Sequence, residues 1–125
     1  KKTNLSDRIP GGGVYSTLED LLKFTKAILS NSLITNSTLQ QMLIPIDAIE
    51  GKNNYGLGWS IYGEKQGYQY GFGHTGSQRG AANQLIIIPD QKASIVVLSN
   101  TSGSLSHVKK VSVDLYENLV LQKPE

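Results

Sequence analysis

The sequence predicts an α+β fold: two N-terminal helices, a four-stranded antiparallel sheet, and a C-terminal helix packed on the sheet. Two observations support this prediction. Apolar residues recur at helical spacing up to about residue 45, alternate or run together between 55 and 99, and return to helical spacing after 105. The expected strands also follow one another through short connections, which antiparallel neighbours allow. Strands grouped between helices indicate α+β rather than an alternating α/β arrangement.

The N-terminal part predicts a loop, two helices and a second loop. Residues 4–13 are expected to be loop, because Pro10 and three consecutive glycines oppose regular structure. A helix is expected from Ser16 to about residue 31, since Thr17 and Asp20 have the spacing of a capping box, as do Ser16 and Glu19. A shorter helix over 37–44 ends before a proline. Residues 47–54 are polar and are expected to form a loop.

The C-terminal part predicts the sheet and its covering helix. Strands are expected over 55–62, 68–74, 80–88 and 93–99, and a final helix over 106–121. The strands are apolar on more than one face, so the sheet needs cover on both sides. The chain offers about one good helix for each face.

Composition excludes several classes of protein. A net charge of +2 and a hydrophobic fraction of 38% argue against disorder, and the balanced charge gives no sign of nucleic-acid binding. Without cysteine, disulfides and thiolate zinc sites are impossible. The longest apolar run, 85–88, is far shorter than the roughly 20 residues that cross a bilayer. The lack of cysteine fits an extracytoplasmic location, in the periplasm, on the cell surface or secreted.

The segment 71–80 is the strongest candidate for a functional site. It holds four glycines, and glycine within a strand often marks the close approach of a ligand or another backbone. His74 offers acid–base chemistry near neutral pH, and Thr75 and Ser77 add hydroxyl groups. The same residues could also form a glycine-rich bulge with a surface histidine. Spacing alone leaves both interpretations open.

Four segments resemble the serine β-lactamase-like superfamily, in the branch of class C β-lactamases, penicillin-binding-protein-like hydrolases, D-aminopeptidases and esterases. Residues 11–21 resemble its GG-x-x-ST-x-x-DL segment, and residues 55–59 its Y-G-L-G-W strand. His74-Thr75-Gly76 resembles its K-T-G or H-T-G motif, and residues 89–100 resemble the hairpin that follows. The four occur in the family's order and cover about residues 10–101.

The resemblance implies the C-terminal part of a longer serine hydrolase. Residues 1–54 would be a loop and helical-subdomain segment, and residues 55–125 the antiparallel sheet with its C-terminal helix. In the family an S-x-x-K nucleophile motif and a Y-x-N or S-x-N motif precede the K/H-T-G strand. Here the only such strings, Ser106 to Lys109 and Tyr116 to Asn118, follow that strand, so both are interpreted as coincidental. The chain also begins Lys1-Lys2-Thr3 without a methionine, and we expect a fragment.

The resemblance also implies an acyl-enzyme mechanism on an amide, β-lactam, D-amino-acid peptide or ester. His74 would support proton transfer among the catalytic groups, and Thr75 and Gly76 would contact the substrate. The Ser77 N–H would be one of the two hydrogen-bond donors that stabilise the oxyanion. No metal or organic cofactor is implied. The expected partners are a small-molecule or peptide substrate and an N-terminal segment of the same protein, with self-association through uncovered faces as a further expectation. Histidine in place of lysine favours esterase or peptidase activity over β-lactamase activity.

Two alternatives remain at this stage. One is a non-catalytic module that keeps the strand around His74 as a binding surface for cell-wall peptide or another ligand. The other is an unrelated α+β domain in which Tyr62, Tyr68 and Tyr70 line a carbohydrate groove. An S-x-x-K motif upstream of Lys1 would favour the enzyme over the module, and binding to cell-wall glycans without hydrolysis would favour the unrelated domain.

Overall fold

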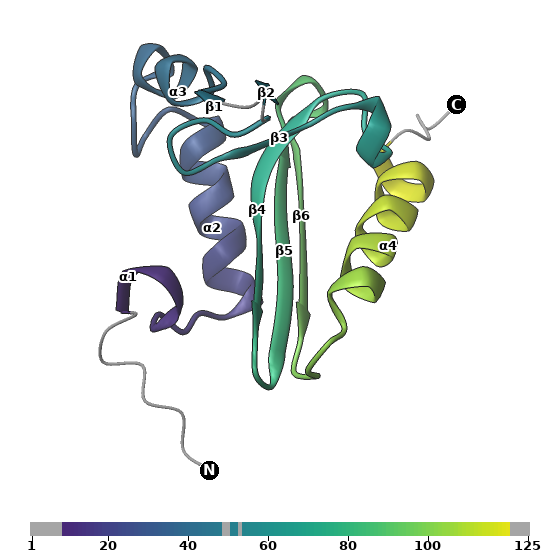
Figure 1. Cartoon of the computed structure of the whole chain (residues 1–125). Coiled ribbons are helices and arrows are strands. Elements are labelled where there is room, and N and C mark those ends of the chain that lie inside the picture. The colour runs from purple at the N-terminus through teal and green to yellow at the C-terminus, as the bar shows by residue number, and fades with distance from the viewer. Residues whose placement is uncertain (1–8, 49–50, 53, 121–125) are drawn as a thin grey trace.

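The computed structural model describes residues 9–48, 51–52 and 54–120, and these form three layers (Figure 1). The central layer is a four-stranded antiparallel sheet in the order β3-β4-β5-β6. Helix α2 (Leu18–Leu29) lies on one face and helix α4 (Leu105–Leu115) on the other. The predicted α+β class, with one helix covering each face of the sheet, is confirmed.

The strands are β3 (Ser60–Tyr62), β4 (Gly71–Gln78), β5 (Ala81–Ile88) and β6 (Ala93–Ser99). β4 and β5 pair without interruption from Phe72↔Ile87 to Gln78↔Ala81, and β5 pairs with β6 from Ala82↔Ser99 to Ile88↔Ala93. β3 pairs only with the beginning of β4, from Tyr62↔Gly71 to Ser60↔Gly73. The second half of β4 therefore lies at an edge of the sheet.

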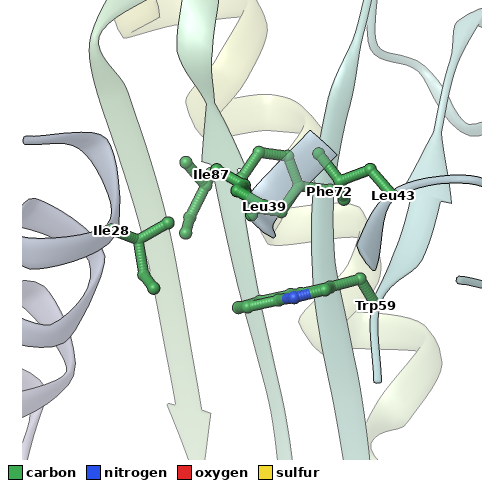
Figure 2. Close-up of a cluster of buried hydrophobic side chains, with 6 residues drawn as sticks. All are labelled: Ile28, Leu39, Leu43, Trp59, Phe72 and Ile87. Carbon is green, nitrogen blue, oxygen red and sulfur yellow. The ribbon is translucent and has the colours of Figure 1, made fainter. Parts of the chain in front are cut away.

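The apolar residues on the two faces of the sheet form separate clusters. On the α2 face the buried residues come from α2, from α3 (Asn36–Met42) and its end, and from the sheet; Figure 2 shows Ile28, Leu39, Leu43, Trp59, Phe72 and Ile87. The rings of Trp59 and Phe72 meet edge to face, with centroids 5.2 Å apart. On the α4 face the cluster contains Tyr62, Tyr68, Ile86, Ile88, Ile95 and Tyr116. Each helix is thus held by its own apolar contacts.

Several expected boundaries in the N-terminal part are wrong. The stretch expected as loop contains one helical turn, α1 (Ile9–Gly12), in which Pro10 occupies an early position that tolerates it. The polar stretch 47–54 contains two short paired strands, β1 (Asp47–Ala48) and β2 (Gly51–Lys52). Parts of the two predicted loops, residues 4–8, 49–50 and 53, lie outside the described residues, as does residue 121, the expected end of the last helix.

The segment 55–62 is a strand only at its end. Gly58 has a φ of +80°, which turns the chain back on itself, and the Gly56 N–H donates to the Trp59 carbonyl at 2.8 Å. β4 in turn continues four residues past the expected end at His74, because β5 pairs with it throughout. The last helix begins at Leu105 and passes into a π-helix, Tyr116–Val120. Its N-cap position is Ser104, immediately before the first helical residue.

Candidate functional site

The free edge of β4 is the central feature of the candidate site. β3 ends its pairing at Gly73, so among the described residues the stretch from His74 to Gln78 has a neighbouring strand on the β5 side only. In an antiparallel strand the N–H and C=O of one residue point to the same side, and successive residues alternate sides. The pairing of β3 therefore indicates which residues of β4 face the free edge.

Ile61 of β3 donates its N–H to the Asn54 carbonyl at 2.7 Å, on the side away from β4. Its neighbours in β3 must then direct their backbone groups toward β4, where they pair with Gly71 and Gly73. Because β4 continues in unbroken register, alternation carries the same direction to Thr75 and Ser77. The backbone N–H groups of these two residues thus face the side of β4 where β3 has ended.

His74 lies at the point where the free edge begins. Its side chain shares the α2 face with Phe72, because residues two apart in a strand lie on the same face, but unlike Phe72 it is exposed. Its Nδ1 lies 2.6 Å from the Thr75 carbonyl oxygen and its Nε2 lies 3.0 Å from the Tyr55 hydroxyl. The contact with the Thr75 carbonyl agrees with the outward direction deduced for that residue from the register.

Gly76 and Thr75 lie on opposite faces of β4. A Cβ added to Gly76 would come within 2.5 Å of the Asn83 side chain on β5, so the Asn83 side chain occupies the space that a side chain at position 76 would need. Thr75 is paired with Gln84, whose side chain is buried against α4. The Thr75 side chain therefore lies on the face of the sheet opposite His74. The Thr75 backbone, rather than its hydroxyl, lies at the free edge.

Two residues of this region escaped the sequence reasoning. Tyr55 was interpreted only as part of a strand, yet it reaches His74 from 19 positions earlier. Gln78 donates from its side-chain amide to the Gly12 carbonyl at 3.1 Å, which fastens the glycine-rich turn to the far end of β4. The spacing of neighbouring residues predicts neither contact, because each depends on how distant segments of the chain come together.

The S-x-x-K and Y-x-N strings of the C-terminal helix lie elsewhere. Ser106 and Lys109 are exposed on α4, across the sheet from His74. Tyr116 of the second string is part of the core: it is 1% exposed, and its hydroxyl accepts from the Gln69 N–H at 3.2 Å. The structure brings neither string to the free edge of β4.

The carbohydrate-groove alternative is contradicted by the same core. Tyr62 and Tyr68 are buried with Tyr116, and the rings of Tyr68 and Tyr116 lie 5.0 Å apart. Burial raises the pKa of both Tyr62 and Tyr68. Of the three tyrosines, Tyr70 alone is exposed, and it lines a cavity of about 370 Å³ between α2, α3 and the sheet.

No group of three or more histidine, aspartate or glutamate side chains is arranged to hold a metal ion in the part of the chain that the structure describes. No helix within it has the length and apolar character needed to span a membrane.

A comparison with protein families agrees with this architecture. The family model described as Beta-lactamase matches residues 2–115, a stretch that includes both covering helices, the whole sheet and the free edge with His74. The match spans far more than half of the 125 residues. With this match and with the strand bearing His74-Thr75-Gly76 at the edge of an antiparallel sheet, the chain belongs to the Beta-lactamase family.

Proposed function

We propose that this chain forms one wall of the active site of a serine hydrolase that works through an acyl-enzyme. The single observation that carries the proposal is the free edge of β4, which directs the Ser77 N–H outward beside the exposed His74. A preorganised backbone N–H in such a place can stabilise the oxyanion that forms when a carbonyl is attacked. The substrate would be an amide, a β-lactam, a D-amino-acid peptide or an ester.

The nucleophile in this proposal comes from outside residues 1–125. Its serine oxygen attacks the substrate carbonyl, and the carbonyl oxygen takes the negative charge while it is bound by two N–H groups. One is the N–H of Ser77 and the other belongs to the nucleophile's own residue. Loss of one such donor typically costs about 3 kcal/mol of transition-state stabilisation. Collapse of the intermediate expels the amine or alcohol, and water then hydrolyses the acyl-enzyme.

The rest of the edge would position the substrate. An extended substrate can add itself to a free strand edge through main-chain hydrogen bonds, and Thr75 offers such groups two residues before Ser77. Gly76 lies between them and has no side chain of its own, and the Asn83 side chain of β5 lies next to it. His74 lies where the free edge of β4 begins. There it can exchange a proton with the reacting groups or face an anionic group of the substrate.

A pair of histidine variants tests the proposal in the full-length protein. His74→Ala should lower kcat/KM for a p-nitrophenyl ester or nitrocefin by roughly 100-fold or more, which is typical of losing a general acid–base group. The melting temperature should barely change, because the side chain is exposed. His107→Ala removes the other histidine, on α4 across the sheet, and should leave the kinetics unchanged. Equal activity in both variants and the wild type would refute the assignment of His74.

The alternative, a non-catalytic module that binds cell-wall peptide or another ligand, makes a different prediction. The protein would then bind a D-amino-acid peptide with no turnover and without labelling by a serine-reactive fluorophosphonate. Labelling of a serine in an S-x-x-K segment upstream of Lys1 would favour the hydrolase. Labelling that depends on Ser106 would contradict our interpretation of the string in α4.

A further inference from the structure

The tautomer of His74 follows from its two hydrogen bonds. Nδ1 lies 2.6 Å from the Thr75 carbonyl oxygen, and a carbonyl oxygen can only accept. Nδ1 must therefore carry a hydrogen and donate it. In the neutral ring the other nitrogen, Nε2, then has a free lone pair and must accept.

Tyr55 supplies the donor that this lone pair requires. Its hydroxyl oxygen lies 3.0 Å from Nε2, within hydrogen-bonding distance, so its O–H donates to the ring. The two rings meet edge to face, with centroids 5.7 Å apart and an interplanar angle of 79°. His74 is thus hydrogen-bonded at both nitrogens and in contact with the Tyr55 ring, although its side chain is exposed.

We propose that Tyr55 is a positioning residue that holds His74 in the Nδ1–H tautomer and in one orientation over the free edge of β4. The consequence for catalysis depends on the function proposed above, whereas the tautomer does not. The same contacts accommodate the charged ring. When Nε2 takes up a proton from a reacting group or from water, it donates to the Tyr55 oxygen, and the tyrosine O–H turns away without any covalent change.

Residues 1–125 contain two histidines, and the variants His74→Ala and His107→Ala each remove the signals of one of them. The ¹⁵N chemical shifts of the imidazole nitrogens distinguish protonated from unprotonated nitrogen. His74 should be protonated at Nδ1 near neutral pH. His107, exposed on α4, should show mainly the Nε2–H tautomer that an unconstrained histidine prefers in water. A His74 pattern like that of His107 would overturn the proposal without any tyrosine variant.

Tyr55→Phe then tests the role of the hydroxyl. It keeps the ring but removes the donor, so the His74 nitrogen shifts should move toward the pattern of His107. The matched control is Tyr70→Phe, since Tyr70 is also 37% exposed and lines the cavity beside α2 and α3. It should leave the shifts of His74 in place. Unchanged His74 shifts in Tyr55→Phe, or equal changes in both variants, would refute a positioning role.

Kinetics separate this inference from the proposed function. If the full-length protein hydrolyses esters, Tyr55→Phe should lower kcat/KM about 10-fold, less than His74→Ala, because a positioning residue acts through the group it orients. Unaltered kcat/KM in Tyr55→Phe would count against the positioning role. If the protein has no hydrolytic activity, the proposed function fails, yet the ¹⁵N shifts still decide whether Tyr55 sets the tautomer of His74.

Discussion

Gly73→Ala should destabilise the fold more than any other single methyl group added to the glycines of β4. A Cβ at this position would lie 1.9 Å from the Leu85 carbonyl oxygen and 2.9 Å from the Ile86 Cα. Both are backbone atoms of β5, the strand paired with β4, so no flexible side chain can move aside. At Gly76, by contrast, the added methyl would meet the side chain of Asn83, which can rotate away.

The expected magnitude follows from this geometry. Relieving the contact requires the two central strands to separate or shift by more than about 1 Å, and overpacking of this kind typically costs 1–3 kcal/mol or more. We expect a loss near the upper end, about 3 kcal/mol, because the residue has β3 on one side and β5 on the other. For a chain of this size the melting temperature should fall by about 10 °C.

Denaturant unfolding followed by circular dichroism provides the assay, with Gly63→Ala as the control. An added Cβ at Gly63 meets nothing within 4 Å, and its φ lies outside the left-handed region. Such a change is expected to be neutral or to stabilise by roughly 0.5 kcal/mol. If the two variants unfold within about 0.5 kcal/mol of each other, the close packing of β4 on β5 at Gly73 is refuted.

Two further predictions concern a helix cap and a buried hydroxyl. Thr17→Ala should lower the free energy of unfolding by about 1 kcal/mol, because the Thr17 hydroxyl caps α2 by accepting from the Asp20 N–H. Ser16→Ala should lower it by almost nothing. Equal losses in urea unfolding would contradict this assignment of the cap. Burial raises the pKa of Tyr68 above its usual 10.0, so the folded state keeps the proton at a pH where the unfolded state releases it, and the free energy of unfolding should fall as the pH rises above about 10. Tyr68→Phe should make that fall shallower in unfolding curves between about pH 8 and pH 11, and identical slopes would argue against the raised pKa.

The local pattern of the sequence determined most of the elements. The change from helical to alternating periodicity separated α2 and α3 from the sheet, and β6 was placed at residues 93–99, the bounds that the structure has. Thr17 and Asp20 marked the start of α2 because a helix cap needs only residues a few positions apart. The motif around His74 pointed to the candidate site for a similar reason, since its glycines and its histidine lie within one short segment.

Tertiary structure alone decided which part of β4 is free and what holds His74. The edge exists because the turn at Gly58 shortens β3, so that its pairing stops at Gly73, and no periodicity within β4 records where its partner ends. The hydrogen bond between Tyr55 and His74 joins residues 19 positions apart. The hydrogen bond from the Gln69 N–H to the buried Tyr116 hydroxyl joins residues 47 positions apart. The spacing of residues along the sequence predicts the face of a strand or helix on which a side chain lies. The groups that it meets depend on the register and length of distant pairings, which only the folded chain determines.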